Sequence, residues 1–97
     1  MNGKQRAYLR KMAHELDPIF RIGKGGVTPE LTNSVGEALE KRELIKLTIL
    51  QNCTEDVQEV ANTISGRTHS EVIQVIGRKF VLYRESKDNK EIVLPKF

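Results

Sequence analysis

The sequence predicts a two-layer α/β domain whose elements follow the order α-β-α-β-α-β-β. Three observations lead to this fold class: helical apolar spacing in three segments, β-branched runs between them, and a hairpin signal near the end of the chain. Strands that alternate with helices imply right-handed crossovers and adjacent parallel strands, and the closing hairpin adds an antiparallel pair. At 97 residues the chain is expected to form one domain, residues 1–97.

The first helix is predicted over residues 3–16. It should stop near Asp17, because the residue before Pro18 is pushed out of the α region. Residues 19–22 then predict a short strand that leads into a glycine-rich turn. The apolar residues of the helix recur at the spacing of one buried stripe: Leu9, Met12, Ala13 and Leu16.

The second helix has a clear predicted start, because Thr28 is a good N-cap and Pro29 suits the first helical position. A strand of alternating apolar and polar residues follows over residues 44–50. The predicted buried stripe of this helix is Leu31, Val35, Ala38 and Leu39. Its glutamates are expected to face solvent: Glu37, Glu40 and Glu43.

A third helix is predicted after a cap at Asn52 or Thr54, with Gly66 as its C-terminal stop. Two strands of high β propensity follow, residues 72–76 and 80–83. Gly77-Arg78 between them favours a tight hairpin turn. Residues 92–94 are a candidate for a short terminal strand.

Charge is distributed unevenly along the chain. Residues 1–27 carry six Lys or Arg against two acids, residues 28–66 carry three against seven, and residues 67–97 carry seven against four. The ends are therefore basic and the middle is acidic. If the ends meet in the fold, they form a positive face that suits a polyanion, whereas scattered solvated lysines are the simpler interpretation.

Several classes of protein are disfavoured by composition. No apolar run approaches the ~18 residues of a membrane span, and the N-terminus lacks the apolar stretch of a signal peptide. Cys53 is the single cysteine, so we expect a reducing, cytoplasmic setting and no cysteine metal site. His14 and His69 show no spacing to each other or to Cys53 that indicates a catalytic set. We therefore expect neither an enzyme nor a bound cofactor or metal.

The turn Gly23-Lys24-Gly25-Gly26 is the most informative local feature. It lies between a predicted strand and the start of a helix, where free amides and the positive end of the helix dipole attract phosphate. Lys24 adds a cation at the tip. An ordinary tight turn that needs positive φ angles explains the same glycines equally well.

Nucleotide-binding motifs do not fit these glycines, because Val27 follows where a P-loop requires lysine and the third glycine of a dinucleotide fingerprint is missing. The basic flank of the first helix makes a nucleic-acid backbone the better candidate. Arg6, Arg10 and His14 lie one turn apart, with two lysines further round. The predicted RNA-binding residues are Gly23, Lys24, Gly25, Gly26, Lys4, Arg6, Arg10, Lys11 and Arg21.

Four separated motifs resemble the CRM domain (chloroplast RNA splicing and ribosome maturation), in particular its stand-alone bacterial YhbY-like form. These motifs are residues 22–28 (IGKGGVT), 43–47 (ELIKL), 75–78 (VIGR) and 81–84 (VLYR), and the resemblance extends from about Leu9 to Leu94. It implies a four-stranded mixed sheet, similar to the C-terminal domain of translation initiation factor three. It also implies that residues 23–26 form the family's GxxG loop and that residues 4–11 belong to its basic first helix.

Two functional hypotheses follow. The resemblance implies a non-enzymatic, monomeric RNA-binding protein that contacts ribosomal RNA of large-subunit precursors and assists their maturation, with ribosomal proteins as further partners. The alternative is a protein-interaction adaptor that docks a ribosomal or assembly protein through the acidic second helix, by way of Glu37 and Glu40. Phosphate contacts position an RNA without reading its sequence, so the predicted residues give no RNA target.

Overall fold

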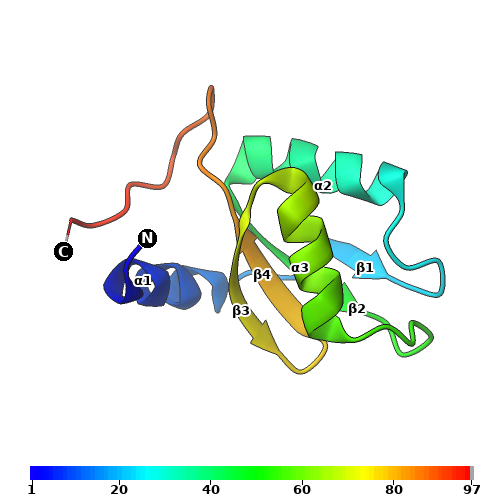
Figure 1. Cartoon of the computed structure of the whole chain (residues 1–97). Helices are drawn as coiled ribbons and strands as arrows, with labels where there is room; N and C mark the ends of the chain where they lie inside the picture. Colours follow the sequence, from blue (N-terminus) through cyan, green and yellow to red (C-terminus); the bar gives the residue numbers. More distant parts are fainter. Residues whose placement is uncertain (97) are drawn as a thin grey trace.

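The computed structural model describes residues 1–96 and contains the predicted elements in the predicted order (Figure 1). These elements are α1 (Gly3–Ala13), β1 (Phe20–Ile22), α2 (Pro29–Arg42), β2 (Leu44–Ile49), α3 (Val57–Thr68), β3 (Glu71–Ile76) and β4 (Lys79–Tyr83). The α/β class and the four-stranded mixed sheet are confirmed.

The strands are arranged in the order β1-β2-β4-β3. β1 and β2 are parallel, as predicted, and β4 is antiparallel to both of its neighbours. The expectation of adjacent parallel strands fails for β2 and β3, because β4 lies between them. The tight turn after β3 brings β4 back at once, and Gly77 adopts the positive φ, 58°, that this turn requires.

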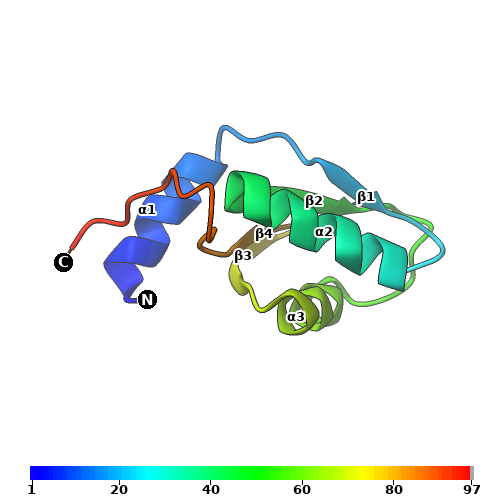
Figure 2. The ribbon, with the colours of Figure 1, turned by 90° about the horizontal axis from the view of Figure 1, so that it is seen from above.

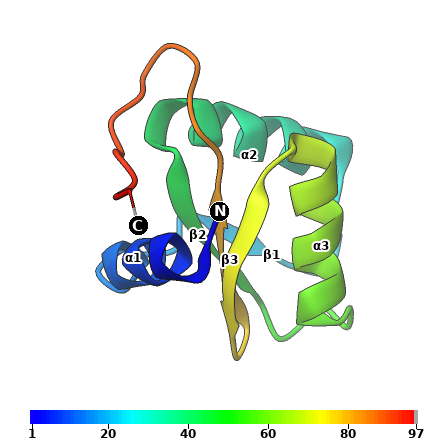
Figure 3. The same cartoon turned by 60° about the vertical axis from the view of Figure 1, so that its left-hand side comes forward.

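One face of the sheet is covered by α2 and α3, while α1 lies against the other face (Figure 3). The main core lies under α2 and α3. It contains alternate residues of β2 and β4 together with the buried positions of both helices: Ile22, Val35, Leu39, Ile45, Leu47, Ile49, Cys53, Val60, Ala61, Ile64, Phe80 and Leu82.

A smaller core lies beneath α1. Leu9 and Ala13 are fully buried there, whereas Met12 and Leu16 are each 37% exposed, so the predicted four-residue stripe is wrong in half of its members. The helix ends at Ala13 rather than near Asp17, so Leu16 lies beyond it, in the connection to β1. The other buried residues of this core come from the sheet and the C-terminal segment: Leu44, Ile73, Val81, Tyr83 and Ile92.

Other boundaries also differ from the prediction. Asp56 caps α3, in place of Asn52 or Thr54, because the chain first makes a turn in which the Cys53 amide donates to the Leu50 carbonyl at 3.0 Å. α3 continues past Gly66 to Thr68, where His69 takes the left-handed conformation that glycine usually supplies.

The C-terminal segment, residues 84–96, contains no strand, so the short strand suggested for residues 92–94 is not formed. The segment runs back past α1, and Gln5 Nε2 donates to the carbonyl of Pro95 at 3.0 Å. The first residues of the chain and residues 92–95 therefore lie close together at α1 (Figure 1). No helix in the described part of the chain is long and apolar enough to cross a membrane.

Candidate functional site

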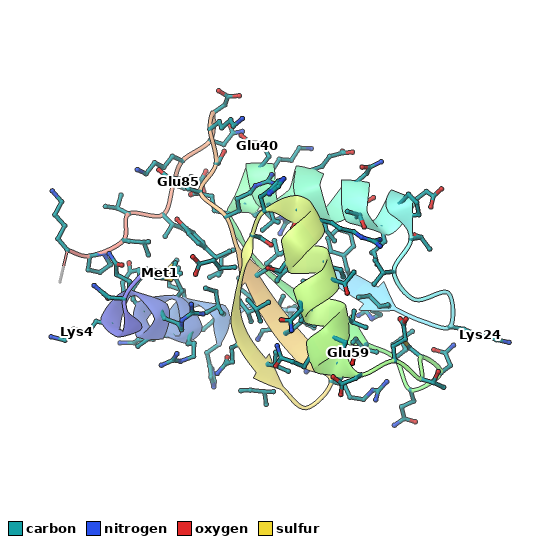
Figure 4. All side chains as sticks on the ribbon, in the orientation of Figure 1. Met1, Lys4, Lys24, Glu40, Glu59 and Glu85 are labelled. Carbon is teal, nitrogen blue, oxygen red and sulfur yellow. The ribbon has the colours of Figure 1, made fainter. Side chains whose placement is uncertain are left out.

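The glycine loop, Gly23–Gly26, projects from the end of the molecule opposite α1 (Figures 1 and 2). It closes as a tight turn in which the Gly26 amide donates to the Gly23 carbonyl at 3.0 Å, and Gly26 has a φ of 64°. Lys24 is exposed at the tip and extends away from the protein (Figure 4). Within residues 1–96, the amides of Lys24 and Gly25 have no hydrogen-bond partner. The tip therefore presents two free donors and one cation.

The base of the glycine loop packs against the chain between β2 and α3. A side chain at Gly23 would meet Asn52, and one at Gly26 would lie 2.7 Å from Glu55 Oε2, whereas a side chain at Gly25 would meet nothing within 4 Å. Gly26 therefore has a structural reason to be glycine, whereas a side chain at Gly23 would make only an ordinary contact with Asn52 Oδ1, at 3.4 Å. Gly25 has neither a positive φ nor a close neighbour, so its small size leaves room for something outside the chain.

The start of α2 contributes less to this loop than the sequence predicts. Thr28 Oγ1 accepts the amide of Leu31 at 3.1 Å, and Pro29 has no N–H to offer. Within residues 1–96, Glu30 is therefore the residue in the first turn of α2 whose backbone amide has no hydrogen-bond partner. The free amides that face an incoming anion therefore come from the loop more than from the helix.

Arg78 supports this region from the β3–β4 turn. Its guanidinium donates to the carbonyl of Ile49, the last residue of β2, at 2.9 Å, and to two carbonyls of the β2–α3 connection, Leu50 at 2.6 Å and Cys53 at 3.1 Å. The same connection carries Asn52 and Glu55, which border the glycine loop. From the sequence, Arg78 was predicted only as a turn residue. Its place in the VIGR motif was the signal that could have indicated a larger role.

The cations of α1 are not brought to the glycine loop. Lys4 and Lys24 mark opposite ends of the molecule (Figure 4), whose longest dimension is 40 Å. Arg6 is engaged within the fold, since its guanidinium donates to the Val72 carbonyl at 2.6 Å and to Glu71 Oε2 at 3.2 Å. Lys11 is exposed and Arg10 is half-buried. The predicted site residues thus form two groups, and Arg21 belongs with the loop.

Glu43 is not the solvent-facing residue that was predicted, because its exposed fraction is 0%. Its carboxylate accepts three backbone amides of the C-terminal segment: Ser86 at 2.8 Å, Glu91 at 2.7 Å and Ile92 at 2.8 Å. The residue ends α2 with a φ of 64°, a left-handed conformation that is costly for a side chain of this size. The helical periodicity gave the wrong result because α2 had already ended at Arg42.

Glu40 has a similar internal role. It accepts the hydroxyl of Ser86 at 2.7 Å and the amides of Lys87 and Asp88, and these bonds hold the pKa of its carboxyl below the ordinary value of 4.5. Arg84 crosses from the segment to the helices, where it donates to the carbonyls of Thr68 and Gly36 at 2.8 Å each. Of the two glutamates considered for an adaptor surface, Glu37 and Glu40, only Glu37 is without such a bond in the described chain.

Comparison with known proteins places the chain in a family. The model of the CRS1/YhbY (CRM) domain matches residues 1–84. The Bacillus subtilis protein named "Probable RNA-binding protein YqeI" is 50% identical over 95 residues, covering 98% of this chain and 99% of that protein. A Haemophilus influenzae protein named "RNA-binding protein" is 34% identical over 96 residues, covering 99% of this chain and 96% of that protein.

A solved structure agrees with these matches. The solution structure of protein SAV1595 from Staphylococcus aureus superimposes with a TM-score of 0.81 at 54% identity, covering 98% of this chain and 99% of that chain. The similarity therefore extends over almost the whole length of both chains. On this evidence the chain belongs to the CRS1/YhbY (CRM) domain family.

Proposed function

We propose that this protein binds RNA and that the tip of the glycine loop holds a backbone phosphate. The observation that carries the proposal is the combination of an exposed Lys24 with the unbonded amides of Lys24 and Gly25. Consecutive free amides beside a lysine ammonium are donors that a phosphate accepts well. The open space at Gly25 lets a phosphate approach the backbone closely.

The names of the B. subtilis and H. influenzae relatives support RNA as the partner. From the family we propose the finer statement that the RNA is ribosomal RNA of precursor large subunits, whose maturation the protein assists in the cytoplasm without catalysis. Arg21 extends the contact from the loop. Arg10, Lys11, Lys4 and, to a smaller degree, the internally bonded Arg6 form a second contact at the α1 end.

The test of the loop is a charge reversal, Lys24→Glu, compared with Lys41→Glu on the exposed surface of α2. Both variants change the net charge equally. Filter binding of an in vitro transcript of large-subunit ribosomal RNA is measured over a salt series. Loss of one phosphate contact should weaken binding and lower the slope of log affinity against log salt by about 0.7 for single-stranded RNA. Equal behaviour of the two variants would remove the loop from the proposal.

The ribosomal part of the proposal is tested by sucrose-gradient sedimentation of cell extracts. We expect the protein to sediment with large-subunit precursors and to leave them after nuclease treatment. A protein confined to the top fractions would contradict the ribosomal assignment. Association that survives nuclease treatment and is lost in Glu37→Lys would instead support the adaptor hypothesis.

A further inference from the structure

The face of the sheet that carries α1 is covered over only part of its area. α1 and the C-terminal segment bury Leu44, Ile73 and Tyr83, where β2 begins and β4 ends. Toward the β3–β4 turn the same face is open, and there Ile76 is 63% exposed and Lys79 is exposed as well. In Figure 2, α1 lies at one end of the molecule and leaves the region near β1 uncovered.

Strand pairing places three exposed residues and the half-buried Thr48 in one row across the sheet. Arg21 of β1 pairs with Thr48 of β2, Thr48 pairs with Lys79 of β4, and Lys79 pairs with Ile76 of β3. Their neighbours in sequence, such as Ile22, Ile49 and Phe80, point into the main core on the opposite face. Two strand spacings separate Arg21 from Lys79, which is about 10 Å between their backbones.

A second row continues this surface toward α1. Lys46 precedes Thr48 by two residues and therefore lies on the same face, paired with Val81, which in turn pairs with Gln74. An irregularity in β3 between Val72 and Gln74 inserts one residue, which is how both Ile73 and Gln74 come to lie on this face. The rows enclose a shallow hollow of about 130 Å³ lined by Lys46, Gln74, Ile76, Lys79 and Val81.

The cations of this surface are unpaired. In the described chain, Arg21, Lys46 and Lys79 form no ion pair and no side-chain hydrogen bond. Glu15 and Asp17 share a depression with Lys46 but lie beyond ion-pair distance of it. Lys46 and Lys79 lie diagonally across β2 and β4, so their positive charges add at the hollow between them and favour an anion there.

We propose that this open sheet face, Arg21, Lys46, Thr48, Gln74, Ile76 and Lys79, is a further RNA-contact surface between the glycine loop and the α1 contact, on which backbone phosphates pair with Lys46 and Lys79. The inference rests on the proposed RNA binding and extends it to residues outside the glycine loop. Arg21 is separated from the loop by Ile22 alone, so a strand held at Lys24 continues directly onto the sheet. α1 borders the other side of the surface. The open face thus joins the two distant groups of cations into one track.

The experiment compares Lys46→Glu/Lys79→Glu with Lys41→Glu/Lys87→Glu, which carries the same change of net charge on exposed residues elsewhere. Binding of the large-subunit ribosomal RNA transcript is measured over a salt series, with thermal unfolding of each variant beside it. We expect several-fold weaker binding for the first pair and a salt slope lower by about 1.5, close to two phosphate contacts. Because Lys46 is half-buried, the single variants Lys79→Glu and Lys87→Glu repeat the comparison without changing it. We expect half of the difference in salt slope between these two variants.

The outcomes separate this inference from the function on which it rests. Wild-type protein that fails to bind the transcript would overturn both. If the wild type binds, Lys24→Glu weakens binding, and the sheet variants match their controls, the open face is overturned and the loop stands. Weaker binding by Lys79→Glu than by Lys87→Glu, at an unchanged unfolding temperature, supports the open face.

Discussion

Where the C-terminal segment packs against α2, charged groups are turned into the fold, whereas at the tip of the glycine loop they point out of it. Glu43 accepts three backbone amides and Arg84 donates to two backbone carbonyls. Lys24 and Arg21, in contrast, have exposed side chains with no partner in residues 1–96. Charged side chains therefore have two roles in this molecule. Groups bonded internally hold the chain together, and groups left unbonded are available to a ligand.

Removal of the Glu43 carboxylate should produce the largest loss of stability. Glu43→Ala leaves the amides of Ser86, Glu91 and Ile92 without their acceptor, and we expect the free energy of unfolding to fall by about 3 kcal/mol. Hydrogen exchange at these amides should speed up first, because the C-terminal segment can detach on its own. Urea unfolding measures the loss, with the exposed Glu37→Ala as control. Equal stability of the two variants would mean that the segment is held by its other contacts.

Acid should weaken the same contacts without a mutation. Burial raises the pKa of Glu43, but the amides of Ile92, Ser86 and Glu91 lower it more, so the pKa lies below its ordinary value of 4.5. A carboxyl whose pKa is depressed by folding contributes its stability above the unfolded value and loses it as pH falls through the folded value. The unfolding temperature should therefore drop as pH is lowered past 4.5. This drop should be smaller in Glu43→Gln, and parallel curves would contradict the assignment.

Arg78 combines both roles, because its guanidinium is bonded within the fold and also supports the region beside the glycine loop. Arg78→Ala should lower the free energy of unfolding by about 2 kcal/mol, since three carbonyls lose a charged donor. RNA affinity should fall as well, because the β2–α3 connection no longer holds the base of the glycine loop. Calorimetry and filter binding measure the two effects. Arg42→Ala, an exposed arginine, is the control, and unchanged RNA affinity at reduced stability would separate Arg78 from the site.

The smallest effects are expected from alanine substitutions at two neighbouring glycines, Gly25 and Gly26. Gly26→Ala should cost about 1 kcal/mol, because φ is 64° there and the new carbon would lie 2.7 Å from the Glu55 carboxylate. Gly25→Ala meets nothing and should leave stability unchanged, but its methyl group should reduce RNA affinity by keeping a phosphate away from the backbone. Paired denaturation and binding measurements test this contrast. Full RNA affinity in Gly25→Ala would argue against close approach at the loop tip.

Local features of the fold could be predicted from the sequence. The start of α2 at Thr28-Pro29 and the turn at Gly77 depend on neighbouring residues alone, and both are confirmed. The order of helices and strands follows from apolar spacing in the same way. The cap of α3 was wrong because Asn52, Thr54 and Asp56 are all able to accept an amide, and only the extra turn at Cys53 selects Asp56.

Contacts between residues far apart in the sequence could not be predicted from local patterns. The bonds from Glu43 to the C-terminal segment join residues more than forty positions apart, and no periodicity in α2 indicates them. Lys24 and the α1 cations are near in the chain, and they were predicted together as one set of RNA-binding residues. Strand β1 and its connection carry the chain along the molecule instead, so the two groups are at opposite ends.

The position of the two chain ends has a practical consequence for how this protein can be studied. Met1 and Pro95 lie at the α1 end and Lys24 lies at the other end (Figure 4), so a fluorophore or an affinity tag attached close to either residue stands clear of the glycine loop. Energy transfer between a donor dye at Met1 and an acceptor dye on the RNA would then measure distance along the long axis of the domain. The efficiency of energy transfer would report in which direction a bound strand runs.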